Sequence, residues 1–352
     1  MDHQPFPEYL AALETDEASC TEPSADKLSF PRLRTDFGPV RQLCLVYPAG
    51  VHEPGSDYSP LAGLYKQLIR LVPMDIEVLL LVKSGQIAAE LQKENFSQRI
   101  RYVVNSELKG IWLRDYAGFN MGSHLVKPTY KPRSYWGDFA VAQHISDNMK
   151  ILHSLLGMDM EPVGLVWDGG NLVTNGRIAF ISRQLLKDNK KGYPDEHQIE
   201  KLIQQTLGVQ PVWVDLPKAD RLSHTDGYLT FISLNKALVS TYPEAWARKY
   251  PKDQQCVDDL ARQVRERGID VERILEQPQD VAEASPVDSA VGIYVNMLQL
   301  NGTWLVPTYD LPGEDEIIAQ LKRLNLNGTI VPINCTELAK MGGVLHCISF
   351  CN

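Results

Sequence analysis

The 352-residue sequence lacks features that define several classes of protein. It contains no run of roughly 18 apolar residues, so we expect no membrane-spanning helix. Residues 1–20 are acidic and lack a basic stretch followed by an apolar one, so they do not resemble a secretory signal. These absences predict a cytoplasmic protein without a membrane partner.

Cysteine and positive charge are also limited. The six cysteines are scattered along the chain, which predicts reduced thiols rather than a disulfide framework. Cys347 and Cys351 lack a second Cys/His pair at zinc spacing, so no metal site is predicted. The formal charge of −9 disfavours nucleic acid and anionic membranes as partners and favours cationic ligands.

The composition that remains is that of a globular protein. Hydrophobic residues make up 44% and charged residues 22%, over a length that can bury a sizeable core. Residues 1–38 are rich in Pro, Asp and Glu, and we predict a surface segment there. Residues 39–352 are predicted to form one catalytic domain.

A hairpin pattern recurs along this domain. Asn175-Gly176 and Asn301-Gly302 each separate two apolar runs, and Asn-Gly favours the type I′ hairpin turn. Asn235-Lys236 and a looser turn at Gly122 occupy equivalent places, and the run LCLVYPAG at 43–50 is a fifth relative.

Between the hairpins lie stretches with apolar residues at helical spacing, often followed by another short strand. The predicted helices cover 61–72, 145–157, 196–208, 257–268 and 314–325. The unit of hairpin, helix and strand therefore repeats about five times, which is typical of packing around one axis. The alternative is an α+β domain with coincidental hairpins.

A polar residue opens each of four hairpins. In a radial fold equivalent positions meet at the axis, so these side chains would converge on one central pocket. If residues 224–226 open a strand, His224 and Asp226 share a face. The residues are Asp115, Asp168, His224 with Asp226, and Asn296.

Taken singly, these motifs are weak. Arg114-Asp115 is typical of a surface ion pair, and Asp168-Gly169-Gly170 is typical of a turn. The hypothesis of a shared site depends on their matching repeat positions and on the terminal stretch GGVLHC at 342–347.

The chemistry of this set favours a cysteine nucleophile. Cys347 needs a partner that lowers its pKa or takes its proton, and His224 is the candidate. His346 would point away from Cys347 if both lie on a strand, which predicts either a packing role or contact with a residue of the site rather than with the substrate. Clustered carboxylates favour a planar guanidinium cation, held and desolvated for attack.

Five motifs in order resemble the family of agmatine deiminases and bacterial peptidylarginine deiminases, from about residue 40 to 352. That family has the pentein fold, a five-bladed α/β propeller with its active site on the axis. The matching motifs are WLRD (112–115), DGGN (168–171), HTD (224–226), YVN…NGTWLVPTY (294–309) and GGVLHC (342–347).

The resemblance implies a role for each matching residue. Cys347 attacks the guanidinium carbon and forms a thiouronium intermediate. Asp115 and Asp226 hold the guanidinium nitrogens. His224 protonates the departing ammonia and then activates water. The product is a ureido compound, and no metal or organic cofactor is required.

Four further positions follow from the same resemblance. Asp168 stands where the family has a Glu beside the histidine or the substrate. Asn296 supports the substrate or the cysteine loop, and Trp112 lines the pocket wall. Arg133 lies in the region of specificity loops, where it would meet a substrate carboxylate; otherwise it is a solvated loop charge.

Departures from the family pattern leave the substrate open. Gly-Pro does not follow Asp115, and Met341 replaces the first of three glycines. Agmatine is the leading substrate, with arginine, peptidyl-arginine or another guanidino compound as alternatives. An amidinotransferase and a non-catalytic pentein binding protein are the other hypotheses. The sequence leaves open whether the chain forms a homo-oligomer.

Overall fold

The structure, a computed structural model, describes residues 33–53, 56–132, 139–147, 149–218, 220–279, 289–324 and 328–352. Four sheets share one plan: an antiparallel hairpin whose second strand pairs in parallel with a third strand. Their strands are β6 (Phe119–Asn120), β7 (His124–Thr129) and β8 (Asp159–Val166); β9 (Leu172–Thr174), β10 (Ile178–Ser182) and β11 (Gln210–Val214); β12 (Leu229–Ser233), β13 (Lys236–Thr241) and β14 (Asp270–Leu275); and β15 (Leu298–Leu300), β16 (Thr303–Thr308) and β17 (Thr329–Asn334).

The fifth sheet follows the same plan but takes its first strand from the other end of the sequence. Its order is β18–β1–β4–β5, with β18 antiparallel to β1 and β1 parallel to β4. Leu43 stands opposite Cys351 in this register. The C-terminal strand thus completes the sheet that the N-terminal strand begins. The strands are β1 (Gln42–Val46), β4 (Glu77–Val82), β5 (Ile100–Val104) and β18 (Phe350–Cys351), with a separate hairpin of β2 (His52–Glu53) and β3 (Ser56–Asp57).

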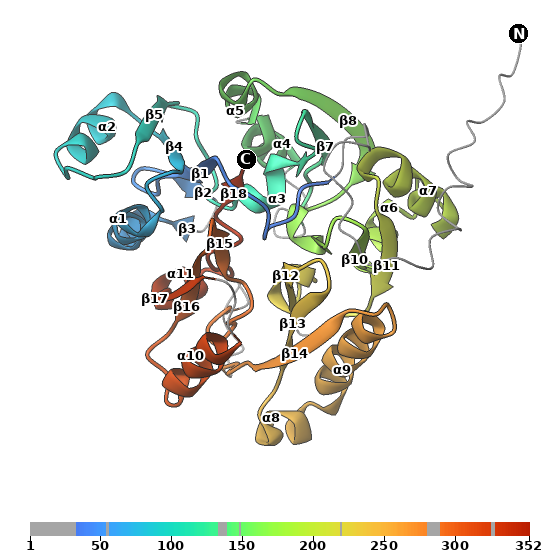
Figure 1. The fold of residues 1–352 in the computed structure, drawn as a ribbon. Coiled ribbons are helices and arrows are strands. Elements are labelled where there is room, and N and C mark those ends of the chain that lie inside the picture. The colour runs from blue at the N-terminus through green and yellow to red at the C-terminus, as the bar shows by residue number, and fades with distance from the viewer. Residues whose placement is uncertain are drawn as a thin grey trace, which may run out of the picture. The chain divides into compact units, whose positions relative to one another are not determined.

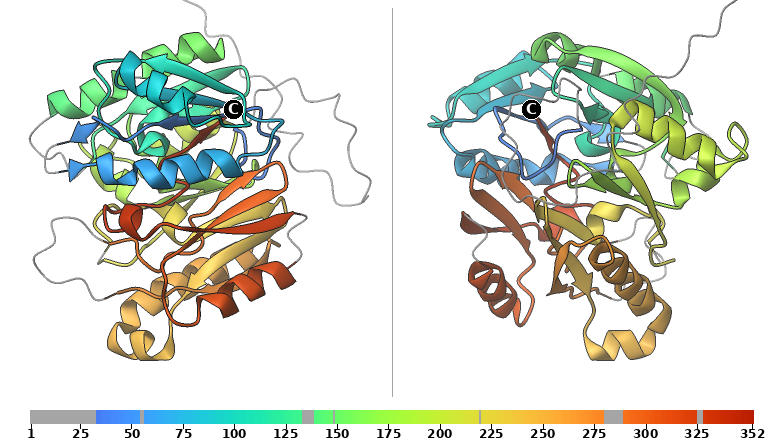
Figure 2. Two further views of the ribbon diagram at one scale, coloured as in Figure 1. Left: turned by 90° about the vertical axis from the view of Figure 1, so that its left-hand side faces the viewer. Right: turned by 45° about the vertical axis from the view of Figure 1, so that its right-hand side comes forward.

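Helices connect the second and third strand of each plan and lie on the outer side of the sheets, as Figures 1 and 2 show. Helices are present in all five predicted stretches. The stretch 145–157 covers the end of one helix and the whole of the next, and the helix predicted at 257–268 begins six residues earlier, at Pro251. The helices are α1 (Ala62–Leu71), α2 (Gly85–Gln92), α3 (Leu113–Ala117), α4 (Phe139–Asp147), α5 (Met149–Leu156), α6 (Gln184–Asn189), α7 (Glu196–Leu207), α8 (Glu244–Lys249), α9 (Pro251–Arg265), α10 (Glu314–Arg323) and α11 (Thr336–Ala339), with 3-10 turns η2 (Ser59–Leu61), η4 (Gly169–Asn171) and η5 (Thr225–Gly227).

The hairpin turns differ from one another more than the sequence suggests. Asn301 and Gly302 both have positive φ, at 45° and 84°, as a type I′ turn requires. At the other Asn-Gly pair only Gly176 has positive φ, because the Asn175 carboxamide accepts hydrogen bonds from Arg177 N and Ile178 N instead. The prediction of a type I′ turn there was wrong, although the hairpin itself is present.

The core lies between the sheets and their helices. Strand β4 is buried along almost its whole length, because it is central in its sheet and is covered by helices.

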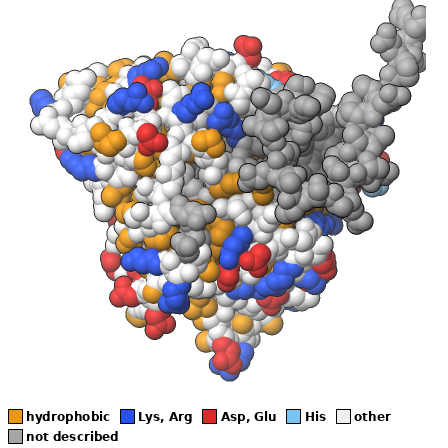
Figure 3. Space-filling model, in the orientation of Figure 1, with side chains coloured by type: hydrophobic (Ala, Val, Ile, Leu, Met, Phe, Trp, Pro, Cys, Tyr) orange, Lys and Arg blue, Asp and Glu red, His pale blue; other side chains and the backbone are white. Residues whose placement is uncertain are grey.

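No helix among the described residues is long and apolar enough to cross a membrane. On the face in Figure 3, acidic and basic side chains are interspersed.

Candidate active site

Five short connecting segments meet at the centre of Figure 1, and each leads into the first strand of one sheet. These segments carry the predicted polar residues, all within five positions of the strand that follows. The repeat therefore does what the sequence pattern predicts, since equivalent positions converge. The residues and their strands are Asp115 before β6, Asp168 before β9, Asp226 before β12, Asn296 before β15 and Cys347 before β18.

The thiol of Cys347 lies beside an amide and a carboxylate. Its Sγ atom is 3.4 Å from Oδ1 of Asn296 and 3.9 Å from Oδ2 of Asp226. Burial raises the pKa of the thiol well above its usual value, and the charges of Asp226 and Asp115 raise it further. At neutral pH the unliganded protein therefore holds a protonated thiol.

His224 lies between two carboxylates rather than against the thiol. Its Nδ1 is 3.7 Å from Oδ1 of Asp115, and its Nε2 is 3.6 Å from Oδ2 of Asp168. Burial alone would lower the pKa of His224, but Asp115, Asp168 and Asp226 raise it to about 10. Among the described residues its Nε2 has no close hydrogen bond, because Asp168 lies slightly too far away. His224 is thus an imidazolium whose Nε2 proton faces Asp168 without a short hydrogen bond.

The loop before His224 is held by a carboxylate that the sequence did not single out. Asp220 accepts hydrogen bonds from the backbone N–H groups of Leu222, Ser223 and His224, at 2.9, 2.8 and 3.3 Å. Ser223 has φ of 54°, a left-handed conformation that is costly for a residue other than glycine. The Asp220 carboxylate therefore stabilises a strained backbone next to the imidazole.

Asp226 has a second histidine as its closest charged partner. Nδ1 of His346 is 2.6 Å from Oδ2 of Asp226, and Nε2 of His346 is 3.2 Å from Oδ2 of Asp36. The other Asp36 oxygen pairs with Arg114 at 3.0 Å. The burial of Asp226 would raise its pKa, but the contact with His346 and the charges of His224 and Arg114 lower it. Asp226 is therefore the buried carboxylate that stays ionised.

Two glycines allow the side chains to approach. A Cβ at Gly170 would lie 2.5 Å from Nδ1 of His224 and 3.0 Å from Oδ1 of Asp115. A Cβ at Gly343 would lie 2.6 Å from the Trp112 ring and 3.1 Å from Cβ of Cys347. Only glycine fits at either position without moving these groups.

A cavity of about 320 Å³ opens from the thiol. Cys347, Asn296, Asp226 and His224 form one end, and an aromatic wall that includes Trp246 of α8 forms another part. Its described charged residues are four carboxylic acids and His224, with no Lys or Arg among them; the acids are Asp220, Asp226, Asp253 and Glu276. The chamber is suited to a cation of small-molecule size.

Glu276 is the most enclosed of these acids, with 2% of its surface exposed. It accepts hydrogen bonds from the Ser240 hydroxyl and from Tyr294 N, both at 2.8 Å, and has no ion pair with a described residue. Burial raises its pKa to about 8. A bound cation would be the missing charge partner of this carboxyl.

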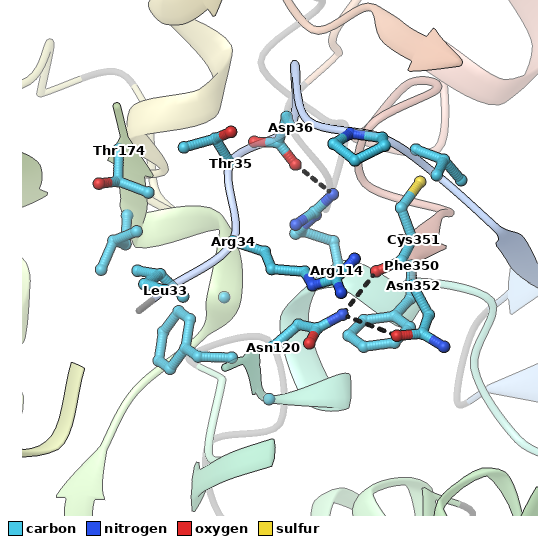
Figure 4. Close-up of a pocket in the computed structure, with 16 residues that line it drawn as sticks. Leu33, Arg34, Thr35, Asp36, Arg114, Asn120, Thr174, Phe350, Cys351 and Asn352 are labelled. Carbon is cyan, nitrogen blue, oxygen red and sulfur yellow. Dashed lines mark hydrogen bonds and ion pairs between the residues drawn. The ribbon is translucent and has the colours of Figure 1, made fainter. Parts of the chain in front are cut away.

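A second, smaller cavity of about 50 Å³ lies behind the site (Figure 4). Asp36 and Arg114 line it together with Cys351 at the end of β18. Asn120 holds the C-terminal end of β18 in place, because its side-chain amide donates a hydrogen bond to the Cys351 carbonyl at 3.1 Å. The Asp36 and His346 contacts lie between this cavity and the thiol.

The structure places the remaining predicted residues as follows. Residues 225–227 form the turn η5, so His224 and Asp226 do not share a strand face as expected. Cys347 and His346 also lie in a turn rather than on a strand. His346 is buried and contacts the site residue Asp226, which is one of its two expected roles. Trp112 packs behind Gly343 and donates to the Tyr58 hydroxyl at 3.1 Å. Arg133 lies outside the described residues.

Little in the sequence pointed to Asp36, Asp220 and Glu276. Asp36 falls in the predicted surface segment 1–38, of which residues 1–32 lie outside the described part. None of the three occupies a repeat position. The only available signal was for His346, which is adjacent to the cysteine.

No group of three or more His, Cys, Asp or Glu among the described residues is arranged to hold a metal ion. The five described cysteines are free thiols.

The chain is similar to proteins of one family over nearly its whole length. Residues 32–351 match the family described as Porphyromonas-type peptidyl-arginine deiminase. The agmatine deiminase of Pseudomonas putida KT2440 is 23% identical over 358 residues, which cover 93% of this chain and 96% of the relative.

Solved structures share the fold. A cysteine-to-serine variant of the agmatine deiminase of C. jejuni, with substrate bound, superposes with a TM-score of 0.76 at 17% identity, over 91% of this chain and 96% of that one. A putative arginine deiminase from Porphyromonas gingivalis gives a TM-score of 0.75 at 17% identity, over 91% and 97%. The predicted pentein fold is confirmed by this likeness.

Proposed function

The chain belongs to the Porphyromonas-type peptidyl-arginine deiminase family, and we propose from this and from its central site that it is a cysteine-dependent guanidine hydrolase. The observation that carries the proposal is the buried thiol of Cys347 beside Asp226, in a chamber that also contains His224. A nucleophile among carboxylates suits an electrophile that is itself a cation.

Substrate binding is the first step of the proposed mechanism. A planar guanidinium donates hydrogen bonds to Asp226 and Asp115, two carboxylates that its fork of N–H groups can engage together. Burial, together with the charges of Asp168 and Asp226, raises the pKa of Asp115 to about 7. Binding of a cation favours the ionised carboxylates, so the substrate brings the charge that the site lacks.

The same charge activates the nucleophile. The thiol pKa is high in the unliganded protein because of burial and the nearby carboxylates. A guanidinium between these carboxylates cancels their effect and favours the thiolate. The proposed substrate therefore assists its own reaction, whereas a neutral amide would leave the thiol protonated.

The chemical steps then use the His224 proton. The Cys347 thiolate forms a C–S bond to the guanidinium carbon and gives a tetrahedral adduct. His224 donates its proton to one nitrogen, the C–N bond breaks, ammonia leaves and a thiouronium remains. Neutral His224 then takes a proton from water, whose oxygen attacks the carbon. As the second adduct collapses, its C–S bond breaks and its hydroxyl proton passes to the departing sulfur, which restores the Cys347 thiol and yields the neutral ureido product.

Among guanidino compounds, agmatine fits the chamber best. The cavity lining presents acids and aromatic rings, and its described part has no Lys or Arg to pair with a carboxylate. A substrate with a second cation gains from Glu276, whereas the α-carboxylate of arginine is repelled by Asp220 and Asp253. The agmatine deiminase relatives support this choice.

The experiment is an assay of ammonia and ureido product with agmatine, free arginine and a peptidyl arginine. We expect turnover of agmatine, loss of activity in Cys347→Ala, and normal activity in the control Cys256→Ala on α9. Amidine transfer to an added amine, without ammonia release, would instead identify an amidinotransferase. Silence in both assays would overturn the proposal.

A further inference from the structure

A chain of three side chains, two of them buried and Asp36 half-buried, runs from the small cavity to the proposed nucleophile. Asp36 contacts His346 at 3.2 Å, and His346 contacts Asp226 at 2.6 Å. The three residues come from separate segments: the strand-free residues before β1, the turn before β18, and η5. Figure 4 shows Asp36 directed toward Arg114 at one end of this chain.

The two ring nitrogens of His346 both face carboxylates. A neutral imidazole has one N–H donor, so it can satisfy only one of them, whereas an imidazolium donates to both. Burial would lower the pKa of His346, as does the charge of Arg114, but Asp36 and Asp226 raise it. Asp36, Asp226 and Arg114 are the charged groups that act on this ring. Their arrangement favours the charged form.

His346 engages only one oxygen of Asp226. Oδ2 accepts from Nδ1 of His346 and faces the thiol, while no described residue hydrogen bonds to Oδ1. The Asp226 backbone carbonyl accepts from the Asn296 amide at 3.1 Å, which fixes the residue in place. Oδ2 of Asp226 is thus held by the His346 cation, and Oδ1 is available to hydrogen bond with a ligand.

We propose that Asp36 is a positioning residue for the reaction: through His346 it keeps Asp226 ionised, with one oxygen held and the other presented to the guanidinium. The inference rests on the proposed function. It assigns a role to a residue from the segment that precedes β1, which does not touch the substrate.

Asp115 shows what happens to a buried carboxylate with a more distant partner. Its closest cation is His224, at 3.7 Å, and its pKa is raised to about 7. Asp226 is even less exposed, with 3% of its side chain accessible against 12%, yet its pKa is lowered. The 2.6 Å contact with His346 is the largest of the interactions that lower the pKa of Asp226, and the charges of His224 and Arg114 add to it. Asp115 has no such contact with a described residue, and burial together with the charges of Asp168 and Asp226 raises its pKa. Without Asp36, His346 has one carboxylate fewer to keep it charged.

Asp36→Asn tests the proposal, because it keeps the shape and removes the charge. The matched control is Asp270→Asn, which breaks the 3.4 Å pair with Lys236 on another sheet. In Asp36→Asn we expect the pKa of Asp226 to rise and the acid limb of kcat/KM to move to higher pH, because Asp226 then protonates as well as Asp115. Below the raised pKa of Asp226, this protonation adds about a tenfold loss of kcat/KM for each pH unit. Much of the loss should be recovered at higher pH, and it should reside in KM more than in kcat. The control should match the parent protein.

A second measurement does not depend on activity or on the stability of a variant. Histidine NMR signals of Cys347→Ala are titrated without substrate, and the His346 signal is assigned by its absence in a His346→Gln double variant. An imidazolium at pH 7 supports the proposal. A neutral His346 at pH 7, or an unshifted acid limb in an active Asp36→Asn, overturns it. If no guanidine is turned over, the proposed function fails, and the NMR titration still decides the state of His346.

Discussion

The Sγ atom of Cys347 lies 3.4 Å from Oδ1 of Asn296. The same oxygen accepts a hydrogen bond from His346 N at 3.1 Å, and the amide nitrogen donates to the Asp226 carbonyl at 3.1 Å. One carboxamide thus connects the nucleophile, the turn that carries it and the carboxylate that faces it.

This connection predicts that Asn296→Ala is damaging. The variant removes the acceptor for the thiol and releases the turn at 346–347, so the sulfur is no longer held toward the substrate. We expect kcat to fall on the order of 100-fold, as small misplacements of reacting groups do. Steady-state kinetics with agmatine check this, and circular dichroism confirms that the fold is kept. Activity within a factor of two of the parent protein would show that Asn296 has no such role.

Activity should depend on pH through Asp115. Burial raises the pKa of this carboxyl to about 7, and only its ionised form binds a guanidinium. Protonation increases as pH falls, so kcat/KM should decrease below about pH 7 and rise above it. His224 stays protonated over this range, because the surrounding carboxylates raise its pKa to about 10. A pH profile of kcat/KM tests the sign; a rate that increases toward pH 5 would contradict it.

Gly170 should tolerate no side chain. The Cβ of Gly170→Ala would meet His224 Nδ1 at 2.5 Å and force the imidazole or Asp115 to move. We expect a loss of kcat on the order of 100-fold. Gly63→Ala on α1 is the matched control, because no atom lies within 4 Å of its new Cβ and the residue does not line the chamber. Equal activity of the two variants would mean that the position of His224 is not critical.

Glu276 should distinguish substrates by the charge of the group at the end opposite the guanidinium. The carboxyl has no ion pair with a described residue, so the ammonium of agmatine is its expected partner. Glu276→Gln keeps the hydrogen-bonding shape and removes the charge. We expect KM for agmatine to rise about tenfold, in keeping with a charged hydrogen bond worth roughly 1.5–3 kcal/mol.

Butylguanidine, which lacks the ammonium, supplies the control for this variant. Its KM should be unchanged in Glu276→Gln, because it has no group to pair with the carboxylate. A similar rise in KM for both compounds would indicate a general disturbance of the chamber rather than loss of a charge partner.

The sequence predicted the fold from local patterns. Hairpin and helix signals depend on neighbouring residues, so the helix at 196–208 and the hairpin at Asn301-Gly302 appear in the structure close to their expected positions. The prediction failed at Asn175-Gly176, where the side chain hydrogen bonds compete with the φ preference that the dipeptide usually shows. The sequence shows that Asn175 can hydrogen bond to the backbone, but it does not show whether this bonding or the φ preference of Asn-Gly decides the turn type.

The repeat also predicted that unlike polar residues meet, because equivalent positions of a radial fold converge. That argument brought Asp115, Asp168, His224, Asp226 and Asn296 together without any long-range information, and the chemistry of a thiol nucleophile added Cys347. It did not predict their pairings. The sequence paired Cys347 with His224, whereas in the structure His224 lies between Asp115 and Asp168 and the thiol contacts Asn296 and Asp226.

By itself the sequence determined which residues converge on the central site, since residue type and repeat position are properties of the chain. Only the tertiary structure decided their charge states and the parts played by Asp36 and Glu276. Protonation depends on burial and on charges a few ångströms away, and these come from segments far apart in sequence, such as Asp36 and His346. The distance between Asp36 and His346 depends on how these two segments pack in the folded protein, and no local sequence pattern encodes it.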